Sequence, residues 1–173
     1  IGLIVDEWGC WYDVEKGTNP GFLYQQNTMR DAIVAAINLN IFNEHSDRVI
    51  MANIAQAVNV LQAVILTEGE KMLLTPTYYV FKLYAEHQDA ELVESWVSSE
   101  KTSCGGIEIP AVTKSVSVDK NGDMLVTVAN CSLDEEYALD ISTGSFEAAS
   151  VNAEILSGDV HSFNSFDEPE KVR

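Results

Sequence analysis

Apolar residues in the first half of the chain form two unbroken runs that predict two strands. The runs are residues 1–5 (IGLIV) and residues 49–54 (VIMANI). A half-exposed strand alternates apolar and polar side chains, whereas a strand that is buried on both faces is apolar throughout. We therefore expect residues 1–5 to form a buried strand of a parallel sheet.

Helices are predicted after each of these strands. The first spans residues 28–43, where a Thr and an Asp three positions later form a capping-box pattern and apolar side chains repeat at helical spacing. Its centre, residues 32–37, is apolar nearly all round, so it must be covered on more than one side. The second spans residues 75–87 and starts with Thr-Pro, which is typical of a helix N-terminus. Residues 64–74 between them predict a small hairpin.

From about residue 90 the pattern changes to short runs rich in β-forming residues, separated by turns. The runs are residues 92–97, 115–118, 124–129 and 137–141, with a hairpin turn at 119–123. Short strands at this spacing indicate an antiparallel β-sandwich. Trp96 is the most obvious candidate for its core.

The fold class is therefore α/β plus all-β, with an α/β part at residues 1–89 and a β-sandwich at residues 90–173. Two β/α units cannot close a sheet on themselves, because a (β/α)₈ TIM barrel takes ~200 or more residues. The chain also opens without an initiator Met or a signal-peptide pattern. We expect it to be a fragment of a longer protein, and the compartment is left open.

Charge and composition exclude several classes of partner. Asp and Glu number 27 against 10 Lys and Arg, for a net charge of -17, which disfavours nucleic acids and anionic membranes. Every apolar run stops well before the ~18 residues that span a bilayer. Three cysteines and three histidines lie far apart in the sequence and indicate neither a disulfide framework nor a metal site. We expect no cofactor, because no Gly-rich phosphate loop is present.

The candidate chemistry lies directly after the first strand, where Asp6 and Glu7 precede Trp8. Carboxylates next to a buried strand are costly unless they are hydrogen-bonded or used in function. Alternation along a strand sends the two side chains to opposite sides, so only one can face a site at the strand end. The structural alternative, with Asp6 capping a turn and Glu7 as an exposed acid, stays open on these residues alone.

Several motifs of this chain together closely resemble the α-L-arabinofuranosidases of glycoside hydrolase family 51. The motifs are IVDEWG (4–9), WY (11–12), NPG (19–21), LYQQNT (23–28), RDA (30–32), MANIAQ (51–56), LTPTY (74–78), FNSF (163–166) and PEKV (169–172). The resemblance covers both halves of the chain. It implies the last two β/α units of a (β/α)₈ TIM barrel, residues 1–89, followed by a C-terminal jelly-roll-like β-sandwich, residues 90–173.

The resemblance also implies a retaining enzyme that removes terminal α-L-arabinofuranosyl residues from arabinan- or arabinoxylan-type glycans. Glu7 then matches the nucleophile, Gln56 a ligand of a substrate hydroxyl, and Trp11 an aromatic wall beside the arabinose. Without the family, Gln56 would be read as a loop amide bonded to backbone, and Trp11 could be core. The family's acid/base glutamate follows an asparagine at a strand end, and no such pair exists here, because Asn43–Glu44 ends a helix.

A second function from a different class is a noncatalytic carbohydrate-binding or assembly module that acts alone. The β-rich half by itself would allow it. A strand that ends in a nucleophile argues against it, because a binding module has no need of one. In a lone fragment, uncovered strands would favour a homo-oligomer whose contact is made by the α/β half.

Overall fold

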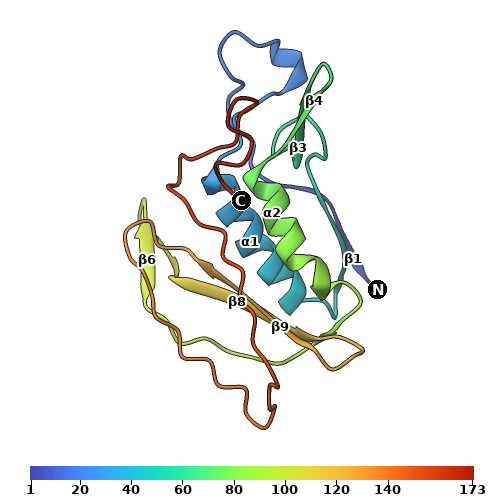
Figure 1. The fold of residues 1–173 in the computed structure, drawn as a ribbon, viewed down its shortest axis with the longest axis vertical. Helices are drawn as coiled ribbons and strands as arrows, with labels where there is room; N and C mark the ends of the chain where they lie inside the picture. The colour runs from blue at the N-terminus through green and yellow to red at the C-terminus, as the bar shows by residue number, and fades with distance from the viewer.

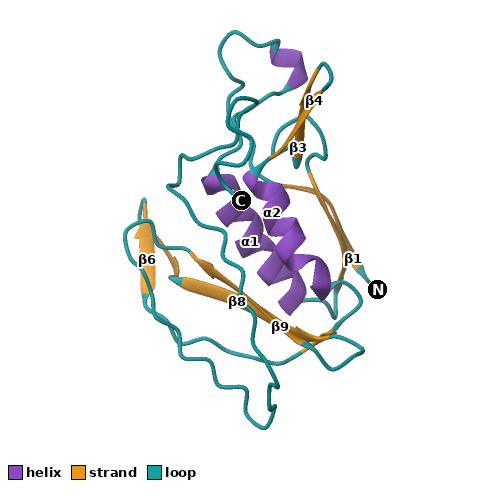
Figure 2. Ribbon diagram, in the orientation of Figure 1, coloured by secondary structure: helices purple, strands orange, loops and turns teal.

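The structure, a computed structural model, describes residues 1–173 except for the side chain of Cys104. Two helices, α1 (Met29–Glu44) and α2 (Pro76–Tyr84), pack side by side at the centre of the molecule. A strand pair, β1 (Leu3–Trp8) and β2 (Val49–Ile54), lies on one side of them, and the sheet that contains β8 (Val112–Val118) and β9 (Met124–Asn130) lies on the other (Figures 1 and 2).

The predicted order of strand, helix, strand and helix in the first half is confirmed. β1 and β2 pair in parallel, and α1 connects them. The predicted hairpin forms from β3 (Ile65–Glu68) and β4 (Lys71–Leu74), which pair antiparallel. The helix predicted to reach residue 87 ends as α2 at Tyr84 and continues as the 3₁₀ turn η2 (Ala85–His87).

Helix α1 begins with the predicted capping box. The Thr28 side chain accepts a hydrogen bond from backbone in the first turn, and the Asp31 carboxylate accepts one from the Thr28 N–H at 2.8 Å. Because its central face is made of alanines, neighbours approach closely: α1 contacts α2, β2, β8 and β9. The expectation that this helix is covered on more than one side is confirmed.

The second half is less regular than the sequence predicts. β5 (Glu91–Leu92), β8 and β9 form one antiparallel sheet, and β6 (Lys101–Cys104) pairs only with β7 (Ile107–Pro110). The predicted strand at 137–141 is wrong, since this segment has no ladder partner in the described chain. Trp96 is also not a core residue: it is 88% exposed, because the strand predicted at 92–97 ends at Leu92.

The expectation that residues 1–5 are buried on both faces is wrong for this chain. Leu3, Ile4, Ile50 and Met51 of β1 and β2 are all exposed. The helices cover one side of this strand pair, and no described segment covers the other. No helix in the described part of the chain is long and apolar enough to cross a membrane.

A buried polar network joins the helices to the sheet. The side-chain carbonyl of Asn40 in α1 accepts hydrogen bonds from Ser115 Oγ in β8 at 3.0 Å and from Thr127 Oγ1 in β9 at 3.1 Å. The two ring nitrogens of His87 lie 2.7 Å from Ser117 Oγ and 3.0 Å from Thr127 Oγ1. Burial lowers the pKa of His87, because the charged ring loses its hydration.

We expect His87→Gln to remove a pH-dependent part of the stability of this chain. Since the folded pKa lies below the unfolded value of about 6.5, the contribution is complete above that value and is lost as the pH falls through the folded pKa. The variant should be less stable at about pH 8, by about 1 kcal/mol for its lost hydrogen bonds.

Denaturant unfolding between about pH 8 and pH 5 checks this expectation. The wild-type chain should lose stability more steeply than the His87 variant as the pH falls. His45→Gln, at an exposed position, is the control and should keep the wild-type slope. A His87 variant with the wild-type slope would show that this ring does not carry the pH dependence.

Candidate functional site

Glu7 and Trp11 line the same small hollow at the carboxyl end of β1. The hollow has a volume of about 120 Å³ and is lined by Glu7, Trp8, Gly9, Cys10, Trp11, Ala55 and Leu61. Both Glu7 and Trp11 are exposed to solvent. The structure thus brings together two of the three residues that the sequence singled out, and Glu7 is the only acid among the lining residues.

Gln56 follows the lining residue Ala55 but does not itself line the hollow. Its side chain is exposed and makes no hydrogen bond to any described residue, while its backbone N–H donates to Val60 O at 3.2 Å. No described backbone group is hydrogen-bonded to this side-chain amide.

A bulge in β1 shapes the site. Val5 pairs with Ala52 and Trp8 with Ile54, so β1 has one more residue than β2 between these pairs. Bulges of this kind bend a strand and redirect its side chains. The alternation of a regular strand therefore does not predict the directions of the Asp6 and Glu7 side chains, and both are exposed.

Trp8 anchors the end of β1 to the helices. Its ring lies 5.3 Å from the Phe42 ring of α1, edge to face, and 6.1 Å from the Phe81 ring of α2, stacked. Aromatic contacts at these distances are favourable. The strand end that carries Glu7 is thereby fixed to both helices of the core.

Two buried glutamines hold the loop that follows Trp8. Gln62 accepts a hydrogen bond from Cys10 N at 2.8 Å, and Gln25 accepts one from Tyr12 N at 2.9 Å. Neither residue was predicted from the sequence to belong to the site. The available signal was Gln62 itself, a polar residue inside the apolar run 60–66 (VLQAVIL).

The same loop is covered by a charged pair. The Arg30 guanidinium carbon lies 3.8 Å from the Tyr12 ring centroid, and its Nη2 lies 3.1 Å from Asp31 Oδ2. Burial raises the pKa of Tyr12 to about 12 and also raises the pKa of the half-buried Cys10 thiol. Both groups are therefore neutral near pH 7, and Cys10 is a packed side chain rather than a nucleophile.

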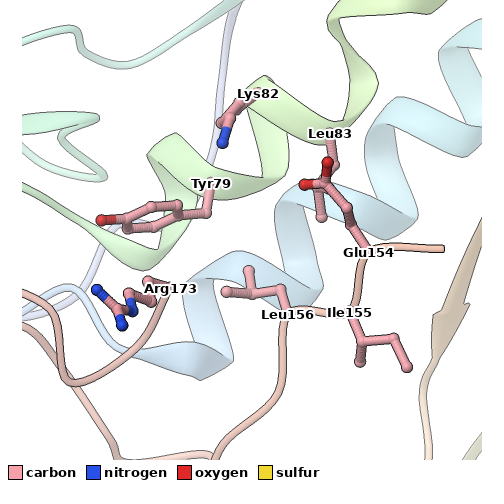
Figure 3. A pocket seen from close by; sticks show the side chains of 7 residues that line it. All are labelled: Tyr79, Lys82, Leu83, Glu154, Ile155, Leu156 and Arg173. Atoms are coloured by element: carbon pink, nitrogen blue, oxygen red, sulfur yellow. The ribbon is translucent and has the colours of Figure 1, made fainter. Parts of the chain in front are cut away.

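A larger cavity, of about 330 Å³, lies between α2 and the C-terminal part of the chain (Figure 3). Its lining comprises Tyr79, Lys82, Leu83, Glu154, Ile155, Leu156 and Arg173. These side chains carry charges of both signs and include none of the residues that the sequence singled out. Among the described residues, no three His, Cys, Asp or Glu side chains cluster as metal ligands would, so no residue is assigned to a metal.

Known proteins resemble this chain over nearly its whole length. A family model described as the α-L-arabinofuranosidase C-terminal domain matches residues 6–173. An intracellular exo-α-L-arabinofuranosidase of Bacteroides ovatus is 45% identical over 175 residues, which cover 100% of this chain and 34% of that protein. An intracellular exo-α-(1→5)-L-arabinofuranosidase of Bacillus subtilis is 25% identical and covers 90% of this chain and 33% of its own length.

Solved structures give the same picture. The GH51 arabinofuranosidase of Xanthomonas axonopodis pv. citri superposes with a TM-score of 0.84 at 39% identity, over 99% of this chain and 35% of that chain. A family 51 α-L-arabinofuranosidase of Bifidobacterium longum superposes with a TM-score of 0.85 at 27% identity, over 100% of this chain and 36% of that one. The chain spans about a third of the length of the curated relatives that it matches.

Proposed function

Because this chain belongs to the family of α-L-arabinofuranosidase C-terminal domains, we propose that it forms the C-terminal third of a glycoside hydrolase that removes terminal α-L-arabinofuranosyl residues from arabinan- or arabinoxylan-type glycans. The observation that carries this proposal is the position of Glu7. It is the only acid that lines a hollow at the end of a parallel strand, and Trp11 lies in the same hollow.

In this proposal, residues 1–89 are the last two units of a (β/α)₈ barrel, and residues 90–173 belong to a β-sandwich. Support for the barrel comes from the parallel pair β1–β2 with α1 as its connection, the repeating unit of that fold. The active site of such a barrel lies at the carboxyl ends of its strands, which is where Glu7 lies. The exposed apolar face of β1 and β2 would pack on the other barrel strands.

The proposed reaction is a double displacement. The Glu7 carboxylate attacks the anomeric carbon and forms a covalent bond to it, while the bond from that carbon to the leaving oxygen breaks. A second carboxyl group, ~5 Å away in retaining enzymes, protonates the leaving oxygen. It then removes a proton from a water whose oxygen bonds to the anomeric carbon as the bond from that carbon to Glu7 breaks. No residue of this hollow can supply that group, so the proposal assigns it to the rest of the enzyme.

Trp11 and Gln56 are proposed to bind the sugar. The exposed indole of Trp11 offers an apolar face on which the C–H groups of a furanose ring can stack. The Gln56 amide can both donate and accept hydrogen bonds, which suits a sugar hydroxyl. Its exposed position beside Ala55, a lining residue, supports this role.

The proposed function is tested with the full-length gene product and an aryl α-L-arabinofuranoside. The expected result is hydrolysis in which the first-formed sugar has the α configuration. NMR measures this configuration before the two anomers equilibrate. A β product would exclude double displacement. Absence of hydrolysis, together with binding of arabino-oligosaccharides, would instead favour the noncatalytic binding module.

We expect the isolated 173-residue chain to associate into a homo-oligomer through its α/β half. Ile50 of β2 is 65% exposed, and burial of apolar surface is worth about 25 cal/mol per Å². The charge of -17 opposes association, but it is screened beyond about 8–10 Å at physiological salt.

Sedimentation at micromolar concentration checks the oligomer. Ile50→Lys should shift the chain toward monomer, whereas Ile155→Lys should not, although Ile155 is 81% exposed and lies in the second half of the chain. A strict 19.0 kDa monomer for the wild-type chain would contradict the expectation. So would dissociation by the Ile155 variant alone.

A further inference from the structure

Gln62 is a buried amide that makes three hydrogen bonds, one through its oxygen and two through its NH₂ group. Its side chain is 0% exposed. Its Oε1 accepts from Cys10 N at 2.8 Å, and its Nε2 donates to Asp31 O at 2.7 Å and to Thr77 Oγ1 at 3.2 Å. One side chain thus connects the loop after β1 to the first turns of both helices.

The orientation of this amide is fixed by its partners. Rotation by half a turn would place the NH₂ group against the Cys10 N–H and the carbonyl oxygen against the Asp31 carbonyl oxygen. Both contacts would be repulsive, and burial would leave the groups without water. Gln62 therefore holds the Cys10 peptide at one position relative to the core.

The neighbouring residues leave this loop little room to move. Gly9 has a φ of +133°, which strains any residue with a side chain, and a Cβ there would make a tight contact of 3.1 Å with Gln62 Oε1. From the other side, Gln25 donates to Cys10 O at 3.2 Å and accepts from Tyr12 N at 2.9 Å. Two buried amides thus hold the N–H and the carbonyl oxygen of Cys10, directly before Trp11.

We propose that Gln62 is a positioning residue for the glycosidase site, which fixes the loop of residues 9–12 so that the Trp11 indole stands beside Glu7. The inference rests on the proposed function, because only a sugar-binding hollow would need Trp11 at a fixed position beside Glu7. Gln62 does not line the hollow and cannot touch substrate. It acts through the backbone of Cys10.

The test is Gln62→Met in the full-length enzyme, with Asn164→Leu as the matched control. Asn164 is also a buried amide, 2% exposed, that makes three hydrogen bonds, to Leu74 O, Val172 O and Val172 N. Both variants replace a buried amide by an apolar side chain and lose three hydrogen bonds, so both should be destabilised. Asn164 holds the C-terminal segment to the end of β4 and lies outside the hollow.

Only the Gln62 variant should have a lower kcat/KM for an aryl α-L-arabinofuranoside. The expected loss is about 10–100-fold, because a small displacement of groups in an active site has an effect of this size. Most of this loss should be in kcat, because a displaced indole supports the transition state less well. Gln25→Met should show the same pattern, and it takes the place of the Gln62 variant if that protein does not fold.

A double-mutant cycle separates positioning from stability. If Gln62 acts through Trp11, then Trp11→Ala should cost several-fold less activity in the Gln62→Met background than in the wild type, because coupled residues are not additive. In the Asn164→Leu background its cost should be unchanged.

The inference is overturned by additive effects of the Gln62 and Trp11 variants, or by a Gln62 variant with the kcat/KM of the Asn164 control. The proposed function survives such a result if the wild-type enzyme hydrolyses the substrate and the Glu7→Ala variant does not. If the wild-type enzyme has no glycosidase activity, the proposed function fails and the positioning role fails with it.

Discussion

Glu7→Ala in the full-length enzyme is expected to lower the turnover of an aryl α-L-arabinofuranoside by several orders of magnitude, because the covalent step loses its nucleophile. Substrate binding should largely survive, since Trp11 and Gln56 are unchanged. Added azide should restore part of the turnover and give a sugar azide of inverted configuration, because a small anion fits in the space that the carboxylate leaves.

Asp13→Ala is the matched control for this prediction. Asp13 is an exposed acid that follows the loop of residues 9–12 but does not line the hollow, so its loss should leave turnover nearly unchanged. Turnover of the Glu7 variant near the wild-type rate would remove the nucleophile assignment. An equal loss in both variants would point to a general effect of charge rather than to covalent catalysis.

The isolated 173-residue chain is expected to have no measurable arabinofuranosidase activity. Its hollow contains a single acid, Glu7, so a leaving group would have to depart without protonation. General acid catalysis contributes typically 10²–10⁴-fold, so its loss alone would bring turnover close to background.

The measurement compares equal molar amounts of the isolated chain and the full-length enzyme. The isolated chain with Glu7→Ala serves as the blank for contaminating glycosidases. Activity of the wild-type chain well above this blank, in a preparation free of the longer protein, would show that the acid/base group lies within these residues after all.

The helical half was predictable because its signals are local. The Thr28–Asp31 capping box and the apolar run at 49–54 each specify one element, and α1 and β2 form where they predict them. The exposure of β1 could not be predicted from local signals of this kind. Sequence pattern describes the environment in which a strand is stable, and no described segment covers one side of β1 and β2.

The β-rich half was harder because strands depend on distant partners. Residues 137–141 have a suitable composition, but no segment that the structure describes pairs with them. The run at 92–97 forms a strand only as far as Leu92, where its pairing with β8 ends. Trp96 is therefore exposed, although tryptophan on its own is a reasonable core candidate.

The site was predictable in part. Glu7 and Trp11 are near neighbours in the sequence, so their meeting in one hollow needs little long-range information. Gln62 was missed, because its importance comes from contacts with Cys10 and Asp31, each more than thirty positions away. A polar residue within an apolar run marks such a position, but only the fold identifies its partners.

The most direct test of the central claim is to trap the covalent intermediate. The full-length enzyme is incubated with an activated, 2-fluorinated α-L-arabinofuranoside, whose fluorine slows hydrolysis of the glycosyl-enzyme, and its peptides are then analysed by mass spectrometry. We expect one sugar per active site, attached to the Glu7 carboxylate. A sugar attached to any other residue, or turnover with no covalent adduct at all, would contradict this account.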